Sequence, residues 1–248
     1  MRLAAIADIH GNCLALEAVL ADIAGQGVDQ VVNLGDHLSG PLEAARTADS
    51  LMAQDITCIR GNHDRWLLET DPDEMGISDI AAFRELTPAH LDWLRTLPAT
   101  DVVADEIFLC HGTPASDVTY WLETVSAAGD VLRADPQQIE HHAADTDFPI
   151  ILCAHTHLPR MVQLADGRLV VNPGSVGCPA YTDDKPTYHI VASGTPDACY
   201  AILEKGEPDA RWSVTHRWVP YDNGAMSRMA QARGRPDWAQ GLATGWIS

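Results

Sequence analysis

The sequence is short of positive charge. Its 248 residues include 16 lysines and arginines, only two of them lysines, against 35 aspartates and glutamates, and the formal net charge at pH 7 is −19. A chain this acidic repels long polyanions, so we do not expect duplex nucleic acid as a partner. Bound metal ions could still reverse the sign of the field locally.

Long apolar runs and paired cysteines are also missing. No stretch approaches the roughly 18 unbroken apolar residues of a membrane span, and the start lacks the basic-then-apolar order of a signal peptide. The six cysteines occur singly, at positions 13, 58, 110, 153, 178 and 199. We therefore expect a cytoplasmic protein with reduced cysteines and no membrane partner. With 46% hydrophobic residues, the chain can bury the core of one large α/β domain.

What the chain does contain is a series of five short polar signatures, each just after a short apolar run. Such runs, flanked by turn residues, are typical of strands covered on both faces, although a buried helical segment can look the same. If they are strands of one sheet, the polar residues all emerge at carboxyl ends, where open α/β sheets bind ligands. The signatures are Asp8-Ile9-His10, Gly35-Asp36-His37, Gly61-Asn62-His63-Asp64, His111-Gly112-Thr113 and Ala154-His155-Thr156-His157.

The spacing within two of the signatures favours metal binding. Asp8 and His10 are two residues apart on an extended chain, so both side chains leave the same face and can bind one ion. His155 and His157 repeat this spacing. A single histidine at a strand end is more often a hydrogen-bonded structural residue. The prediction of a metal site therefore depends on the joint pattern of all five signatures.

In order and spacing, the five signatures resemble those of the calcineurin-like metallophosphoesterases, and among these the compact bacterial phosphodiesterases. The likeness covers roughly residues 1–220. It implies an α/β fold of four layers, in which a two-sheet β-sandwich is flanked by helices. It also implies two metal ions, one bound by Asp8, His10 and His157 and the other by Asn62, His111 and His155, with Asp36 bridging them.

The resemblance also implies catalytic roles. His63 would be the acid that protonates the leaving oxygen, and Asp64 would orient its imidazole. Two ions about 3.5–4 Å apart can hold a hydroxide between them and clamp the phosphoryl oxygens during in-line displacement. Mixed oxygen and nitrogen ligands favour divalent transition metals over magnesium or calcium. We expect manganese, with iron, zinc, nickel and cobalt as alternatives.

One departure from the protein phosphatases of this superfamily narrows the substrate. In those enzymes the Gly-Asp signature continues into Asp-Arg-Gly, whose arginine helps to hold the phosphate, whereas this chain reads Gly35-Asp36-His37-Leu38-Ser39-Gly40. Two dications offset by two carboxylates and a hydroxide leave about one positive charge, which suits a singly charged diester. We therefore expect a small phosphodiester substrate. The alternatives are a phosphomonoester, a dinucleoside polyphosphate, or a non-catalytic binding scaffold.

Three further residues are candidates for substrate binding, and each has a structural alternative. Asn12 either contacts the phosphate or, as we favour, caps the helix that follows it. His37 either lines the pocket or is an ordinary turn residue. Arg65 could supply positive charge beside the acid signature, or it could form a surface ion pair.

We expect a single domain over residues 1–248 with two insertions. Residues 65–105 should be mainly helical, and residues 113–147, which connect two ligand-bearing strands, are the candidate lid. Short apolar runs at 188–192, 199–203 and 213–219 predict strands of a second sheet. The tail from about residue 223 predicts a short helix and a loose end, and it is a candidate contact in a homo-oligomer.

Overall fold

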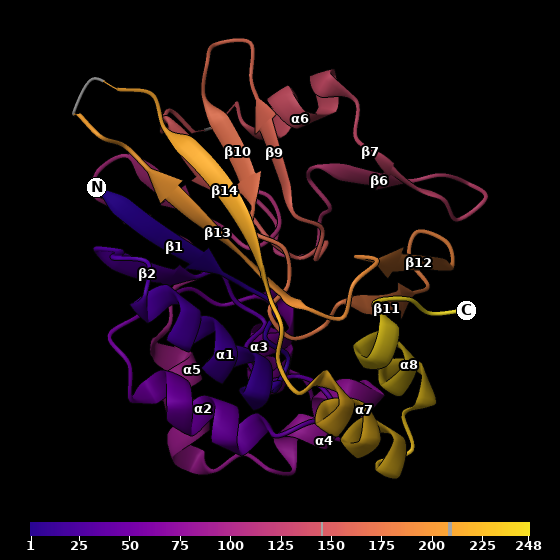
Figure 1. Ribbon diagram of the computed structural model, residues 1–248. Helices are drawn as coiled ribbons and strands as arrows, with labels where there is room; N and C mark the ends of the chain where they lie inside the picture. Colours follow the sequence, from indigo (N-terminus) through magenta and orange to yellow (C-terminus); the bar gives the residue numbers. More distant parts are fainter. Residues whose placement is uncertain (145, 208–209) are drawn as a thin grey trace.

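Two five-stranded sheets form the centre of the computed structural model, which describes residues 1–144, 146–207 and 210–248. Helices lie outside the first sheet, and a hairpin and a short helix lie near the second (Figure 1). The expected fold class, an α/β two-sheet sandwich flanked by helices, is confirmed.

The first sheet combines the start of the chain with a late antiparallel pair. Its order is β14-β13-β1-β2-β3, in which β1, β2 and β3 run parallel and β13 pairs antiparallel with β1. The strands are β1 (Arg2–Ile6), β2 (Gln30–Asn33), β3 (Thr57–Cys58), β13 (Ala198–Glu204) and β14 (Ser213–Val219).

The second sheet has the order β4-β5-β8-β10-β9 and a parallel centre, because β8 pairs in parallel with both β5 and β10. Two more strand pairs, β6 with β7 and β11 with β12, form separate hairpins. The strands are β4 (Asp101–Val103), β5 (Ile107–Leu109), β6 (Glu123–Val125), β7 (Val131–Arg133), β8 (Ile150–Leu152), β9 (Arg160–Gln163), β10 (Leu169–Asn172), β11 (Ala180–Asp183) and β12 (His189–Ala192).

The alternation of side chains along β1 shows how the layers are built. Leu3 and Ala5 point into a cluster shared with β5, β8 and β10 of the second sheet. Ala4 and Ile6 point the other way, into a cluster with the apolar face of α1 (Cys13–Ala24). A strand that is buried on both faces is continuously apolar, and this explains the uninterrupted run at the start of the sequence.

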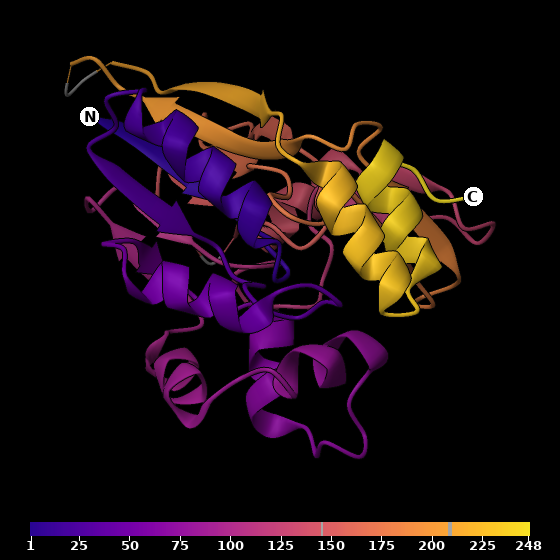
Figure 2. The ribbon, with the colours of Figure 1, turned by 60° about the horizontal axis from the view of Figure 1, so that its bottom comes forward.

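The remaining helices differ in what they cover. Helix α2 lies beside α1 near the first sheet, α3 to α5 occupy the predicted helical insertion, and α6 lies near the second sheet (Figures 1 and 2). Their bounds are α2 (Ala44–Met52), α3 (Asn62–Glu69), α4 (Ile77–Phe83), α5 (Pro88–Thr96), α6 (Pro136–His142), α7 (Asn223–Ala232) and α8 (Pro236–Thr244). In the part of the chain that the structure describes, every helix is too short or too polar to cross a membrane.

Two expectations about strand membership are wrong. Strands β13 and β14 extend the first sheet instead of forming the second, and β12 pairs with β11 in its own hairpin. The five ligand-bearing strand ends are likewise divided between the two sheets instead of belonging to one. The apolar pattern of a segment such as β13 indicates a strand that is buried on both faces, but it does not predict which strand lies next to it.

The tail also differs from the expected short helix and loose end. Helices α7 and α8 lie side by side (Figure 2, yellow), and the Asn223 amide donates to the Leu242 carbonyl at 2.9 Å. Met226, Trp238 and Leu242 are buried in a cluster with Leu42 from the first half of the chain. The tail is therefore an ordered part of the domain core.

Candidate active site

The structure brings all seven predicted metal ligands together, at strand ends of both sheets. The ligands from the first sheet follow β1, β2 and β3, and those from the second sheet follow β5 and β8. They are Asp8, His10, Asp36 and Asn62 from the first sheet and His111, His155 and His157 from the second. The carboxyl ends of the parallel strands of both sheets thus meet at one place.

Five of these residues have backbone conformations that L-amino acids rarely adopt. Asp8, His10, Asp36, His155 and His157 have φ between 51° and 69°, in the left-handed region. Only two other non-glycine residues of the described chain share this property. Because such conformations cost free energy and cluster at functional sites, their concentration here is independent support for a site.

The first potential ligand set consists of Asp8, His10 and His157. Each offers an oxygen or nitrogen atom, and these atoms all lie within 4.8 Å of one another. The Nε2 atoms of the two histidines are 3.2 Å apart, and Oδ1 of Asp8 is 3.7 Å from Nε2 of His157. All three residues are buried.

The second set consists of Asp36, His111 and His155, with Asn62 beside it in the same cavity. Oδ2 of Asp36 is 3.2 Å from Nε2 of His111 and 3.8 Å from Nε2 of His10, so this oxygen lies between the two sets. The other oxygen, Oδ1, accepts a hydrogen bond from the backbone of His63 at 2.9 Å, in the first turn of α3. A carboxylate is favoured in that position because the amino end of a helix is electropositive.

Backbone carbonyls fix the orientation of three imidazole rings. Nδ1 lies 2.7 Å from the Ser39 carbonyl in His10, 2.8 Å from the Leu34 carbonyl in His111 and 2.7 Å from the Cys178 carbonyl in His157. A carbonyl can only accept, so Nδ1 carries the proton in each ring. The Nε2 lone pairs that face the cluster are then available to a metal, which is the arrangement of metal-binding histidines in general.

The cluster has polar atoms that the described protein leaves without hydrogen-bond partners. Both carboxylate oxygens of Asp8 and Oδ1 of Asn62 are buried and have no hydrogen-bond partner among the described residues, and Nε2 of His111 has only Oδ2 of Asp36 beside it, at 3.2 Å. Leaving such atoms unpaired costs roughly 1–3 kcal/mol each, and more for a charged group. Their chemistry, oxygen and imidazole nitrogen converging on one place, fits divalent transition metals.

Burial and the neighbouring carboxylates set the protonation of the cluster. Burial lowers the pKa of His10 to about 4 and takes the pKa of His157 well below its usual value, so both rings are neutral at pH 7, as metal ligation requires. Burial also lowers the pKa of His111, but Asp36 outweighs it and raises that pKa to about 10. To hold a metal through Nε2, His111 would have to be in its neutral form.

His63 lies at the edge of the cluster and is held by a residue that the sequence did not indicate. Its Nδ1 is 2.7 Å from Oδ1 of Asp79 in α4, and the same oxygen accepts a hydrogen bond from Oγ of Ser39 at 2.7 Å. Burial lowers the pKa of His63, but Asp36 and Asp79 outweigh it and raise that pKa to about 9. These two carboxylates thus favour the protonated form of the imidazole.

The expectation that Asp64 orients His63 is wrong. The carboxylate of Asp64 is fully buried and accepts backbone hydrogen bonds from Asp36 at 2.8 Å, His37 at 3.0 Å and Gly61 at 3.0 Å. Because it faces the backbone at the start of α3, it cannot also face the His63 imidazole. Asp64 instead joins the loop after β2 to the loop after β3, and so positions the backbone of Asp36.

The three predicted substrate-binding residues have structural partners. Oδ1 of Asn12 accepts from the Ala15 backbone at 3.2 Å, which is the cap that we favoured, and Nδ2 donates to the Gly177 carbonyl. His37 is fully buried, with Nε2 3.0 Å from the Ile59 carbonyl. Both residues are fully buried and neither lines the cavity beside the ligands, so their structural alternatives describe them better than substrate contact does.

Arg65 is also placed away from the ligands. Its guanidinium forms a bidentate ion pair with Asp117, at 2.7 and 2.9 Å, and it lines a neighbouring groove instead of the cavity that holds the cluster. Of the two alternatives for Arg65, the ion pair is the one that the structure has. The pair joins α3 to residues 113–147, and whether that segment acts as a lid stays a prediction.

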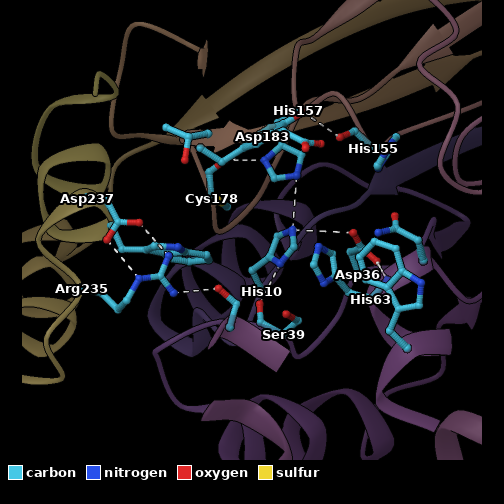
Figure 3. Close-up of a pocket in the computed structure, with 16 residues that line it drawn as sticks. His10, Asp36, Ser39, His63, His155, His157, Cys178, Asp183, Arg235 and Asp237 are labelled. Atoms are coloured by element: carbon cyan, nitrogen blue, oxygen red, sulfur yellow. Dashed lines mark hydrogen bonds and ion pairs between the residues drawn. The ribbon is translucent and has the colours of Figure 1, made fainter. Parts of the chain in front are cut away.

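A cavity of about 260 Å³ opens beside the ligands, and much of its wall comes from residues that sequence patterns did not single out. Figure 3 shows Arg235 and Asp237, at the start of α8, on one side of His10 and His63 on the other. Trp66 and Trp238 add aromatic surface, with ring centroids 4.7 Å from His63 and 6.0 Å from His10 respectively. No local motif marks these residues, since they lie in the helical insertion and in the tail.

Comparisons with known proteins identify the family of the chain. The chain matches the family model described as calcineurin-like phosphoesterase superfamily domain over residues 1–195. It is similar to the crystal structure of a metallophosphoesterase from Sphaerobacter thermophilus, with 26% identity, 99% of both chains covered and a TM-score of 0.73. That structural match includes the tail, which lies beyond the residues that the family model covers.

Two further relatives are described only as hypothetical or uncharacterized. The fold is similar to that of hypothetical protein PH1004 from Pyrococcus horikoshii OT3, with 21% identity, a TM-score of 0.73, and 100% of this chain and 99% of that chain covered. Uncharacterized protein MJ0912 from Methanocaldococcus jannaschii is 24% identical over 207 residues, which cover 76% of this chain and 81% of the relative.

Proposed function

Because the chain belongs to the calcineurin-like phosphoesterase superfamily, whose members use divalent metals, we propose that it hydrolyses small phosphodiesters at a centre for two metal ions. The observation that carries the proposal is the pair of ligand sets, which meet at Oδ2 of Asp36 and include buried atoms without partners. When bound, the ions would polarise the phosphoryl oxygens and activate a water molecule.

The predicted assignment of ligands is compatible with this geometry. Asp8, His10 and His157 would hold one ion, and Asp36 would be shared. The second ion would be held by His111, His155 and Asn62, whose Oδ1 is buried and has no partner among the described residues. Mixed oxygen and nitrogen donors suit manganese, and iron, zinc, nickel and cobalt are the alternatives.

The other steps belong to side chains of the protein. His63 lines the cavity and, with Nδ1 held by Asp79, would present Nε2 as the atom that donates a proton to the leaving oxygen. The aromatic surfaces of Trp66 and Trp238 would restrict water around the reacting phosphate. Asp79 is a positioning residue in this scheme, since it acts through His63.

The charge of the cavity favours a diester over a monoester. Arg235 is the one arginine or lysine that lines the cavity in the described part of the chain, and Asp237 neutralises it at 3.0 and 2.7 Å. A dianionic monoester would therefore find no unpaired cationic side chain, whereas a singly charged diester needs none. Phosphomonoesters and dinucleoside polyphosphates are the alternative substrates, and a scaffold without catalysis is the alternative function.

A comparison of two model substrates tests the proposal. Manganese-loaded enzyme should hydrolyse bis-para-nitrophenyl phosphate with a kcat/KM at least about tenfold above that for para-nitrophenyl phosphate, a difference of about 1.4 kcal/mol in transition-state stabilisation. Metal content must be equal in both assays. A tenfold preference for the monoester would reverse the substrate class, and no hydrolysis of either ester would favour the scaffold.

A further inference from the structure

A second hollow adjoins the cavity beside the metal ligands. We call the first, of about 260 Å³, the proximal cavity, and the second, of about 800 Å³, the outer groove. His155, Trp66 and Asp183 line both of them, so the two hollows meet next to the ligands. A phosphate placed at the ligands would thus have room for a substituent on each of two sides.

Only one of the two hollows is lined by His63, the proposed proton donor. His63 lines the proximal cavity and does not line the outer groove. Hydrolysis of a diester forms a P–O bond from water, breaks the P–O bond to the leaving group, and places a proton on the leaving oxygen. The proton donor has to lie on the side of the leaving group, and that side is the proximal cavity.

The far wall of the proximal cavity is flat and its charge is neutralised. The guanidinium of Arg235 is fixed by Asp237 and by Oγ of Ser78 at 2.8 Å, and it lies 5.6 Å from the ring centroid of Trp238. This part of the wall offers an aromatic surface and a paired guanidinium, while Asp183, elsewhere in the lining, adds a carboxylate. A compact, uncharged group such as an aromatic alcohol fits such a wall.

The outer groove is larger and its walls are of another kind. Val118, Thr124 and Val125 line one part, and the loop with Lys185 lines another. Lys185 is exposed and has no ion-pair partner among the described residues. Asp183 and Asp184 line the groove beside it, so the groove has room for a bulky substituent and carries both signs of charge.

We propose that the site binds asymmetric phosphodiesters in one orientation, with a compact leaving group in the proximal cavity and a larger retained group, of nucleoside size, in the outer groove. This inference rests on the proposed phosphodiesterase function and adds the orientation in which the substrate binds. The retained phosphate monoester would leave through the groove, and the free alcohol through the proximal cavity.

Two exposed residues provide a matched pair of variants. Thr182 lines only the proximal cavity, Val118 lines only the outer groove, and both side chains are exposed, so a tryptophan at either position fills one hollow without entering the core. The substrates are two para-nitrophenyl phosphate diesters with the same leaving group, one with methyl and one with thymidine as the retained group.

Thr182→Trp should raise KM for both diesters by the same factor, about fivefold, because their leaving groups are identical. Val118→Trp should raise KM about fivefold for the thymidine diester and leave the methyl diester within about twofold. Calorimetry with thymidine monophosphate, the product that keeps the retained group, should show weaker binding to Val118→Trp and unchanged binding to Thr182→Trp. Metal content is measured in every variant.

Other patterns overturn the inference. If the effect of Thr182→Trp depends on the retained group while that of Val118→Trp does not, the orientation is reversed. If neither variant distinguishes the diesters, the hollows do not hold the substituents. Both of these results leave the phosphodiesterase proposal intact, whereas failure of metal-loaded wild-type enzyme to cleave either diester removes that proposal and the inference together.

Discussion

The metal ligands and the wall of the proximal cavity lie within a few ångströms of each other, yet they are encoded differently. Every ligand belongs to a short polar signature at a strand end, and the fold brings these ends together. The wall is built from α4, β11 and the start of α8, which are far apart in the sequence and have no shared motif. Local sequence thus indicates the ligands of the proposed centre, while the cavity wall beside them depends on how distant segments pack.

The first and largest effect is expected when the residue shared by both ligand sets is removed. Asp36→Ala should lose both ions and reduce turnover by more than about a thousandfold, because Asp36 lies between the two sets. Elemental analysis and kcat measure the two effects. Asp55→Ala, at an exposed carboxylate, is the control and should change neither. A full complement of metal in Asp36→Ala would contradict the bridging assignment.

The second prediction separates the acid from the ligands. His63→Ala should leave metal content nearly unchanged and slow esters with alkoxide leaving groups by about 10²–10⁴-fold, while para-nitrophenolate esters, which need little protonation, slow far less. Rates for the two ester types and elemental analysis provide the test. Equal slowing of both, or loss of metal, would mean that His63 acts through phosphate binding or coordination.

The third prediction concerns Asp79, which lies in α4 next to the wall residue Ser78 and contacts the His63 imidazole. Asp79→Ala should lower kcat for alkoxide-leaving esters about tenfold and leave KM and metal content near the wild-type values, because the orientation and the raised pKa of His63 both depend on Asp79. The double variant with His63→Ala should be no slower than His63→Ala alone. Additive losses in the double variant would show that Asp79 acts independently of His63.

The smallest effect on catalysis is expected in the tail. Leu242→Ala removes a buried side chain from the cluster that holds α7 and α8, and should lower the free energy of unfolding by about 2–5 kcal/mol. Turnover of the folded variant per bound metal should stay within about twofold of wild type. Denaturant unfolding and kcat test this, and loss of metal from the folded variant would show that tail and centre are not separable.

The sequence predicted the fold and the ligands of the proposed metal centre, but not the residues around them. The two-sheet α/β fold and the superfamily were predicted and are confirmed. The ligand positions were predicted and come together, while their roles stay predictions. Asp79 could not have been found, because nothing near it in sequence distinguishes it from other exposed-looking aspartates. Asp64 was misassigned because adjacency in sequence to His63 does not determine where a helical side chain points.

Strand pairing was the other limit. The apolar run in β13 correctly predicted a buried strand. Its antiparallel pairing with β1, however, joins the two ends of the sandwich domain in sequence, with Arg2 opposite Glu204, and no local pattern predicts such a pairing. Arg65 and Asn12 show the reverse case, in which ordinary structural chemistry, an ion pair and a helix cap, explains a residue near a signature. Polar residues close to a site are therefore weak evidence of substrate contact without the tertiary structure.

The division of each ligand set between the two sheets also has a mechanical consequence. Asp8 and His10 follow β1, whereas His157 follows β8, and Asp36 follows β2, whereas His111 follows β5. Each bound ion would cross-link the two sheets, so the sheets could not separate without releasing it. An ion present at a hundred times its dissociation constant would add about 2.7 kcal/mol to the resistance to unfolding. The supply of metal would then govern the lifetime of the folded chain as well as its turnover.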